Sequence, residues 1–246
     1  MSDPRGYNDD ELMAVLLSRE VRDGEVSACG ALSQIPATGL LLAKHTHAPE
    51  AELIILNTVF RPFHTSRQFH FLAQRGELGL FFVSGVQIDR RGNYNLHQLG
   101  DPDHPTLRFP GGYGGGMIYY CAHRTVVFRT EHTRRSLVEK VDFVSAAGHT
   151  APDVLRLGGP SKVVTPKATL RFESGPGELR LESVHPGHGI DDVQANTGFD
   201  LGDTSAVPAT EAPTAHELHV LRTVVRPLML ETGTYARWVE RAIAPG

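Results

Sequence analysis

The feature that most constrains the fold is an alternation of short apolar runs with helical patterns along the first half of the chain. The runs ELIILN (52–57) and LGLFFVSGVQID (78–89) are typical of buried strands. Helical patterns lie over 9–20, from Pro36 to the residue before Pro49, and over 62–76. Because alternation at this pace is typical of parallel sheets, we predict an α/β fold: a three-layer, open, mostly parallel sheet with helices on both faces.

The last third of the chain departs from this alternation. The segments SKVVTPKATLRFE (161–173) and GELRLESVHPG (177–187) flank a turn sequence, Ser174-Gly175-Pro176-Gly177. This pattern predicts an antiparallel hairpin added late to the sheet. A helix is expected over 216–230, with an interruption at Pro227.

Composition indicates how large a core the chain can bury and which partners and cell compartment to expect. The chain has 246 residues, of which 40% are hydrophobic, so it can bury a large core. We predict a single domain over 1–246, in which 202–246 form a C-terminal extension of loop and helix packed on it. The net charge of −4, with acidic and basic residues interspersed, argues against nucleic acid or a membrane as partner. Two separated cysteines and no secretion signal predict a cytoplasmic protein.

The stretch RFPGGYGGGMIYY (108–120) is unusually rich in glycine, between a short β-like run and a helix predicted to begin at Met117. Bare backbone before a helix lets N–H groups approach a ligand closely, which suits a phosphate or a developing oxyanion. The loop lacks the third glycine of a dinucleotide fingerprint and the lysine of a Walker loop. A cradle for an oxyanion or a thioester carbonyl and a purely structural tight turn both stay open.

Other residues that could carry chemistry give weaker signals. The thirteen histidines include His45 and His47, but no further ligands follow at a metal-binding spacing, so we predict no metal and solvated or core-edge histidines. Asp191 and Asp192 could act as a carboxylate pair, although their place at a predicted helix start favours capping. No GxSxG nucleophile motif occurs.

Four motifs, taken in order, resemble one family. VQIDRRGNYN (86–95) is similar to the QxDxxGNxN segment of the beta subunit of class I CoA-transferases, and FPGGYGGG (109–116) to the PGxGG loop of that family. SVHPGHGIDDVQANTGFDL (183–201) resembles its late HPG…V…TGF motif, and HAPEAELIILN (47–57) fits the strand after its second helix. The resemblance therefore implies the CoA-transferase fold and an acyl-CoA substrate.

A hydrolytic relative fits two further features. The segment PTAHELHVLRTVVRP (213–227) looks like the beta subunit of the actinobacterial steroid ring-opening CoA hydrolase. In the transferases, a glutamate just after the strand that ends near residue 57 attacks the acyl-CoA and becomes a covalent thioester. Asn57 and Thr58 stand at that place here. An amide is not such a nucleophile, and a threonine hydroxyl would need a neighbouring base.

The resemblance also implies a site and a partner. The backbone N–H groups of Gly112, Gly114 and Gly115 are the candidate catalytic donors, which would stabilise negative charge on a carbonyl oxygen as water adds. The candidate substrate-binding residues are Asn57, Thr58, Gln87, Asn95 and Tyr113. Gln87 and Asn95 fit equally well a role in bonding the backbone of their own turn. An alpha subunit, in an α2β2 heterotetramer, would supply the base, and no cofactor is expected beyond the coenzyme A of the substrate.

Three functions stay open at this point. The first is the beta subunit of a CoA-thioester-dependent hydrolase that opens a ring or splits a carbon–carbon bond, as in steroid or cyclic-ketone catabolism. The second is the B-type subunit of a CoA-transferase that moves CoA between carboxylic acids with another carboxylate. The third is a non-catalytic subunit that supports an active partner.

Overall fold

The structure, a computed structural model, describes residues 5–63 and 65–246, and its chain divides into two compact units. Unit 1 comprises Met1–Phe69, Leu78–Phe82 and Ala212–Gly246, and unit 2 comprises His70–Glu77 and Val83–Glu211. The segment predicted as a C-terminal extension is therefore shared between the two units. The single domain stays a prediction.

Unit 1 holds two whole strands and the first part of a third, all of them parallel. They are β1 (Val26–Cys29), β2 (Glu52–Ile55) and β3 (Leu80–Ser84), and β1 lies between the other two, with Ala28 paired to Ile54 on one side and Phe81 on the other. Most of these side chains are buried, which explains why the strands read as largely apolar runs. The predicted run 78–89 is interrupted at Gly85, where a side chain would crowd the backbone of Gln87.

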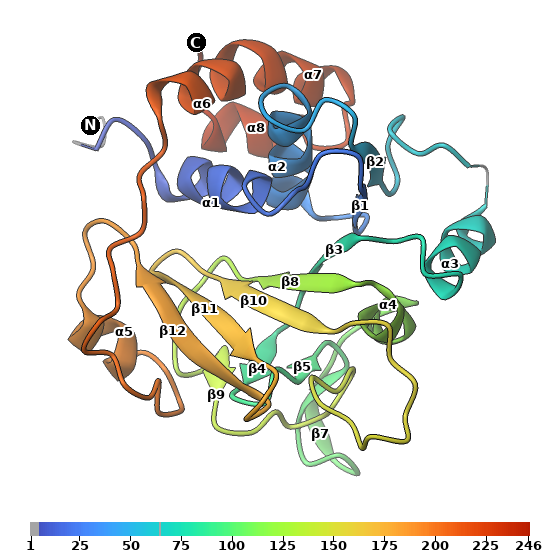
Figure 1. Ribbon diagram of the computed structural model, residues 1–246, viewed down its shortest axis with the longest axis vertical. Helices are drawn as coiled ribbons and strands as arrows, with labels where there is room; N and C mark the ends of the chain where they lie inside the picture. Colours follow the sequence, from blue (N-terminus) through green and yellow to red (C-terminus); the bar gives the residue numbers. More distant parts are fainter. Residues whose placement is uncertain (1–4, 64) are drawn as a thin grey trace. The chain divides into compact units, whose positions relative to one another are not determined.

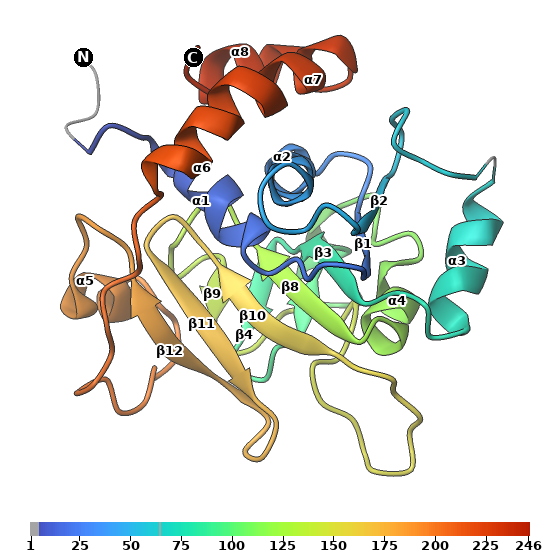
Figure 2. The ribbon, with the colours of Figure 1, turned by 45° about the horizontal axis from the view of Figure 1, so that its top comes forward.

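Helices form a layer on these strands. The helices α1 (Asp9–Ser18) and α2 (Gln34–Lys44) lie beneath α6 (Ala215–Val220), α7 (Arg226–Glu231) and α8 (Ala236–Ala242), as Figures 1 and 2 show.

Local sequence explains where these helices begin and how they meet. The Asn8 side chain accepts from the Glu11 N–H and Glu11 reaches back to Asn8, so the predicted first helix starts with a capping box. The buried Glu11 carboxylate also binds Arg222 at 2.8 Å. Pro227 stands in the first turn of α7, directly after a π-helical turn at Leu221–Val225, so the predicted interruption is confirmed.

Unit 2 carries the late hairpin. The strands β8 (Arg124–Phe128) and β10 (Pro160–Val164) are parallel, whereas β11 (Ala168–Glu173) pairs antiparallel with β10 and with β12 (Glu178–Val184) (Figure 2). The hairpin β11–β12 confirms the prediction. The prediction of one strand over 161–173 was wrong, because Thr165 turns the chain: its N–H and its hydroxyl both donate to the Ala168 carbonyl.

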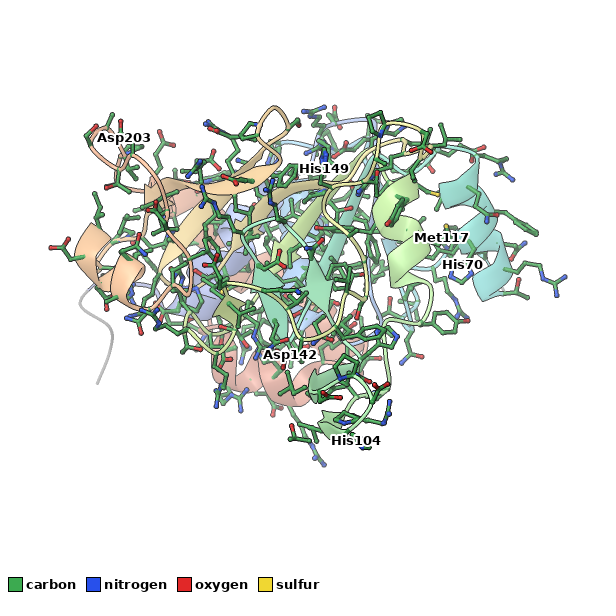
Figure 3. All side chains as sticks on the ribbon, turned by 90° about the horizontal axis from the view of Figure 1, so that it is seen from below. His70, His104, Met117, Asp142, His149 and Asp203 are labelled. Carbon is green, nitrogen blue, oxygen red and sulfur yellow. The ribbon has the colours of Figure 1, made fainter. Side chains whose placement is uncertain are left out.

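Short strands and helices make up the rest of unit 2. The strands are β4 (Gln87–Asp89), β5 (Tyr94–Asn95), β9 (Leu137–Val138), β6 (Gln98–Gly100) and β7 (Pro105–Arg108). The helices are α3 (Ser66–Gln74), which continues from unit 1, α4 (Gly115–Cys121) and α5 (Ile190–Ala195). The hairpin β6–β7 leads directly into the glycine loop, and His104 lies at its tip (Figure 3). The predicted helix over 62–76 includes residue 64, which lies outside the described residues.

Within the described ranges, no helix combines the length and the apolar character needed to cross a membrane.

Candidate functional site: a glycine loop faced by polar rings

The glycine loop, residues 110–116, connects β7 to α4, which begins two residues before the predicted Met117. Gly111 has a φ of 86°, and Tyr113, at the tip, has a φ of 48° and is 83% exposed. The Gly115 N–H donates to the Gly112 carbonyl at 2.7 Å, so this predicted donor is engaged within the loop. The N–H groups of Gly112 and Gly114 make no hydrogen bond to another described residue. Of the three predicted donors, Gly112 and Gly114 are therefore the two whose N–H groups are available to a ligand.

His70 explains why residue 114 is a glycine. A Cβ at Gly114 would collide with the His70 imidazole, and Nε2 would be its nearest atom. The same ring contacts the Tyr113 ring, with centroids 5.5 Å apart. Figure 3 shows His70 on α3, close to α4 with its Met117. A side chain at residue 114 would therefore displace this imidazole from the loop.

Two further ring side chains face the loop from β5 and the segment after it. A Cβ at Gly111 would lie 2.9 Å from His97 Nε2, and one at Gly115 would lie 3.0 Å from the Tyr94 hydroxyl. Tyr94 is fully buried, and its hydroxyl has no hydrogen-bond partner among the described residues. Because burial raises the pKa of Tyr94, the phenol stays protonated and is a donor without an acceptor.

The turn after β4 is held by one buried carboxylate. Asp89 accepts from the backbone N–H of Arg91 at 3.0 Å and of Asn93 at 3.1 Å, and from Asn93 Nδ2 at 3.0 Å. Gly92 completes the turn with a φ of 71°. Burial raises the pKa of Asp89, against these hydrogen bonds, which lower it. The Asp, Gly and Asn of the QxDxxGN pattern are therefore explained by the predicted turn.

Gln87 and Asn95 are brought together on β4 and β5. Asn95 Nδ2 donates to Gln87 Oε1 at 2.8 Å and to the Gln98 carbonyl at 2.6 Å, while Asn95 Oδ1 accepts from the His97 N–H at 3.0 Å. Gln87 Oε1 also accepts from the Asp142 N–H at 2.9 Å. Both side chains are buried and bond the local chain, which supports the alternative of a structural role. Direct substrate binding by either stays a prediction.

Asn57 and Thr58 belong to unit 1 and form the turn after β2. Asn57 is exposed and has a φ of 62°. The Thr58 hydroxyl donates to the Ile55 carbonyl at 2.8 Å and accepts from the Phe60 N–H at 3.1 Å. No carboxylate occurs within this turn, and the Thr58 hydroxyl is in contact with no base among the described residues. The turn therefore carries no group that could act as the transferase nucleophile.

The histidines that the structure describes give no sign of a metal site. No cluster of three or more metal-ligating side chains occurs among the described residues. His132 departs from the expected solvated or core-edge type: it is buried, with Nδ1 2.7 Å from the Thr165 hydroxyl and Nε2 3.0 Å from the Thr197 hydroxyl. Burial lowers the pKa of His132 to about 4. It is therefore a neutral structural histidine at ordinary pH.

Asp192, one of the predicted carboxylate pair, lies in the first turn of α5. It binds Lys167 Nζ at 2.8 Å, and this hydrogen bond lowers the pKa of the carboxyl group. Gly189 occupies the N-cap position, so neither Asp191 nor Asp192 is the capping residue itself. A charge pair with Lys167 accounts for Asp192 without any role in acid–base chemistry.

Sequence reasoning missed the rings that face the loop. None of His70, Tyr94 and His97 was singled out from the sequence. Their one shared signal is nearness to a predicted motif: Tyr94 lies within the GNYN segment, and His97 follows it.

Comparisons with known proteins were consistent with this geometry. Residues 56–196 match the Coenzyme A transferase family. The B subunit of glutaconate CoA-transferase from Acidaminococcus fermentans is 29% identical over 92% of this chain and 96% of its own length. The solved structure of glutaconate CoA-transferase from that bacterium has a TM-score of 0.77 and 27% identity, over 89% of this chain and 95% of its own.

A second relative has a hydrolytic name. The cholesterol ring-cleaving hydrolase IpdB subunit of Mycobacterium tuberculosis is 33% identical over 150 residues, which are 58% of this chain and 59% of that subunit. The solved structure of IpdAB from Rhodococcus jostii RHA1 has a TM-score of 0.79 over 96% of this chain and 98% of its own, at 24% identity, and so shows the fold. The predicted fold class is confirmed. Because the family match spans the Asn57 turn, the Asp89 turn and the glycine loop, the chain belongs to the Coenzyme A transferase family.

Proposed function

We propose that this chain is the B-type subunit of a two-subunit enzyme that hydrolyses an acyl-CoA substrate, opening a ring or splitting a carbon–carbon bond next to a carbonyl group. The observation that carries the proposal is the turn after β2. Asn57 and Thr58 stand where the family's transferases have their glutamate, and the Thr58 hydroxyl is committed to the Ile55 carbonyl. This turn therefore offers no nucleophile that could form a covalent acyl intermediate.

The glycine loop also supports the proposal, because it offers hydrogen-bond donors to a substrate oxygen atom. When water adds to a carbonyl group, negative charge develops on the oxygen atom, and backbone N–H groups that are already oriented stabilise it. The N–H groups of Gly112 and Gly114 have no hydrogen-bond partner among the described residues, whereas the N–H group of Gly115 donates to the Gly112 carbonyl. The proposed oxygen-binding donors are therefore Gly112 and Gly114, with Gly115 fixing the shape of the loop.

The base that activates water is proposed to come from a partner chain. The glutaconate CoA-transferase relative and the IpdB relative are each a subunit of an enzyme, which supports a partner for this chain as well. An alpha subunit that contributes a carboxylate would complete the enzyme, in an α2β2 assembly in the cytoplasm, with coenzyme A present only as part of the substrate. Tyr113 of the glycine loop, which is exposed, would contact the acyl group. Asn57, exposed in its own turn, stays a predicted substrate-binding residue.

A CoA-transferase is the second candidate, and one observation favours it. The glutaconate CoA-transferase relative matches 92% of this chain, against 58% for the ring-cleaving hydrolase subunit. In that case a carboxylate outside the Asn57 turn would carry the acyl group. A purely supporting subunit is the third candidate, and it predicts that the glycine loop can be altered without effect on turnover.

Oxygen labelling separates these candidates. The complex with its alpha subunit is incubated in ¹⁸O-water with 2-oxocyclohexanecarboxyl-CoA, a cyclic 3-ketoacyl-CoA, or with glutaconyl-CoA plus acetate. Hydrolysis places one ¹⁸O atom in the new carboxylate of the product, because the attacking oxygen comes from water. Transfer of CoA to acetate without label from water would contradict the proposal.

A further inference from the structure

We infer that His97 is a further substrate-contacting donor of the glycine-loop site and that Ser145 is the residue that positions it. The inference rests on the proposed function, because it assigns a role toward the same substrate oxygen. It is carried by the contacts of a single imidazole ring, whose two nitrogen atoms have different surroundings. Nδ1 lies 2.5 Å from the Ser145 hydroxyl, and Nε2 faces the backbone of Gly111.

The contacts of Ser145 decide which nitrogen carries the proton. The Ser145 hydroxyl oxygen accepts from the Leu96 N–H at 2.7 Å. Its own proton has one acceptor among the described residues, the Nδ1 atom of His97. A neutral imidazole that accepts at Nδ1 carries its proton on Nε2. Ser145 therefore makes Nε2 a donor.

That donor is directed at the glycine loop. A Cβ at Gly111 would lie 2.9 Å from Nε2 and 3.1 Å from Cδ2 of His97, so only a glycine leaves the ring in place. The φ of 86° at Gly111 also favours glycine at this position. Nε2 has no acceptor among the described residues, and the side chain is partly exposed. A ligand oxygen held by the Gly112 N–H would supply the missing acceptor.

The backbone of His97 is held by hydrogen bonds at both its N–H and its carbonyl group. The His97 N–H donates to Asn95 Oδ1 at 3.0 Å, and the His97 carbonyl accepts from the Phe109 N–H at 2.8 Å. Phe109 is the residue that enters the glycine loop. Asn95, predicted as a substrate-binding residue, thus acts in this arrangement by positioning His97. Held donors of this kind need no reorganisation when charge develops on the substrate, which is what transition-state stabilisation requires.

Paired substitutions test the donor in the complete two-subunit complex. His97→Phe keeps a ring against Phe143, whose centroid lies 5.0 Å away, but removes both nitrogen atoms. It is expected to lower kcat by about a hundredfold with a smaller change in KM. His97→Gln keeps an N–H donor and is expected to recover most of that loss. His104→Phe, at the exposed tip of the same hairpin (Figure 3), is the matched control and should stay within about twofold of wild type.

A measurement of the tautomer tests Ser145 independently of turnover. In long-range ¹H–¹⁵N spectra of the histidine-labelled complex, the signals that His97→Gln removes should show a proton on Nε2. Ser145→Ala should shift those signals toward a mixture of tautomers and lower kcat by about tenfold, while His104 stays unchanged. Adding 2-oxocyclohexanecarboxyl-CoA should move the Nε2 signal.

The outcomes separate this inference from the proposed function. Wild-type kcat in His97→Phe, or a proton on Nδ1 in the wild-type complex, would overturn the inference even where hydrolysis occurs. Transfer of CoA in place of hydrolysis, together with an Nε2 signal that moves on acyl-CoA addition and a large kcat loss in His97→Phe, would overturn the hydrolase proposal and leave the donor role of His97 standing.

Discussion

The turn after β2 and the glycine loop after β7 share one backbone feature and differ in what surrounds it. Among the described residues, Asn57 and Tyr113 are the two that are not glycine and yet have a left-handed φ, 62° and 48°. Asparagine adopts this conformation at small cost, whereas for an aromatic residue it is uncommon and strained. Both residues were predicted site residues, and strained backbone gathers at functional sites.

The surroundings of the two segments support our proposal that the glycine loop, and not the Asn57 turn, contacts the reacting oxygen atom. In the Asn57 turn, the Thr58 hydroxyl is hydrogen-bonded within the turn, to the Ile55 carbonyl and the Phe60 N–H. In the glycine loop, by contrast, the N–H groups of Gly112 and Gly114 are available to a ligand, and the side chains of His70, Tyr94 and His97 lie close to the loop backbone. In our account the nucleophile has been lost from one segment, and the oxygen-binding donors are retained in the other.

Gly114→Val should have the largest effect. Its β-carbon would displace the His70 ring and move the Gly114 N–H, so turnover by the complex should fall by about a hundredfold or more. Steady-state kinetics with the proteins at matched purity measure this.

The matched control is Gly175→Ala, because nothing lies within 4 Å of a β-carbon at that position. It should keep wild-type turnover and a similar unfolding free energy. Undiminished turnover in Gly114→Val would remove the distinction between the two segments and favour a supporting subunit.

Asn57→Ala should lower the unfolding free energy by about 1 kcal/mol, because alanine does not share the tolerance of asparagine for a left-handed φ. Asn57→Gly should leave it within about 0.5 kcal/mol of wild type. Denaturant unfolding of the two variants tests this pair. Equal stabilities would show that the left-handed turn is not required in solution.

Tyr113→Gly should raise the unfolding free energy by up to about 1 kcal/mol, since it relieves strain at an exposed side chain. Turnover should fall at the same time if Tyr113 contacts the acyl group. A gain of stability without loss of turnover would make Tyr113 a residue of the turn alone.

Thr58→Val should have the smallest effect on catalysis, a change of a few-fold at most, with a loss of about 1 kcal/mol of stability from the two hydrogen bonds of the hydroxyl. Kinetics and denaturant unfolding of the same preparation measure both. A loss of turnover as large as that of Gly114→Val would identify Thr58 as a nucleophile after all.

Local signals made much of the fold predictable. The first helix is capped within one short segment at Asn8, and the hairpin β11–β12 turns within its own sequence, so the helix and the hairpin were both found from sequence alone. The break between β10 and β11 was missed although Pro166, directly after Thr165, marks it in the sequence. The bond from the Thr165 hydroxyl to the Ala168 carbonyl spans only three residues and belongs to the same local turn.

The site was predictable in its backbone and not in its side chains. Clustered glycines show that something approaches the chain closely, but they do not show what. The contact of His97 with Ser145 joins residues 48 positions apart, and that of Gly114 with His70 joins two segments with no shared pattern. Such contacts are set by the packing of β4, β5 and the segment before Ala146, which no local sequence pattern specifies.

Trapping of a covalent intermediate tests the central claim most directly. The complex is incubated with glutaconyl-CoA or 2-oxocyclohexanecarboxyl-CoA, treated with borohydride or hydroxylamine, and both chains are mapped by mass spectrometry. Our account predicts turnover with no modified glutamate or aspartate on this chain. A carboxylate of this chain that is converted to an alcohol or a hydroxamate, with loss of activity, would contradict it and make the enzyme a transferase.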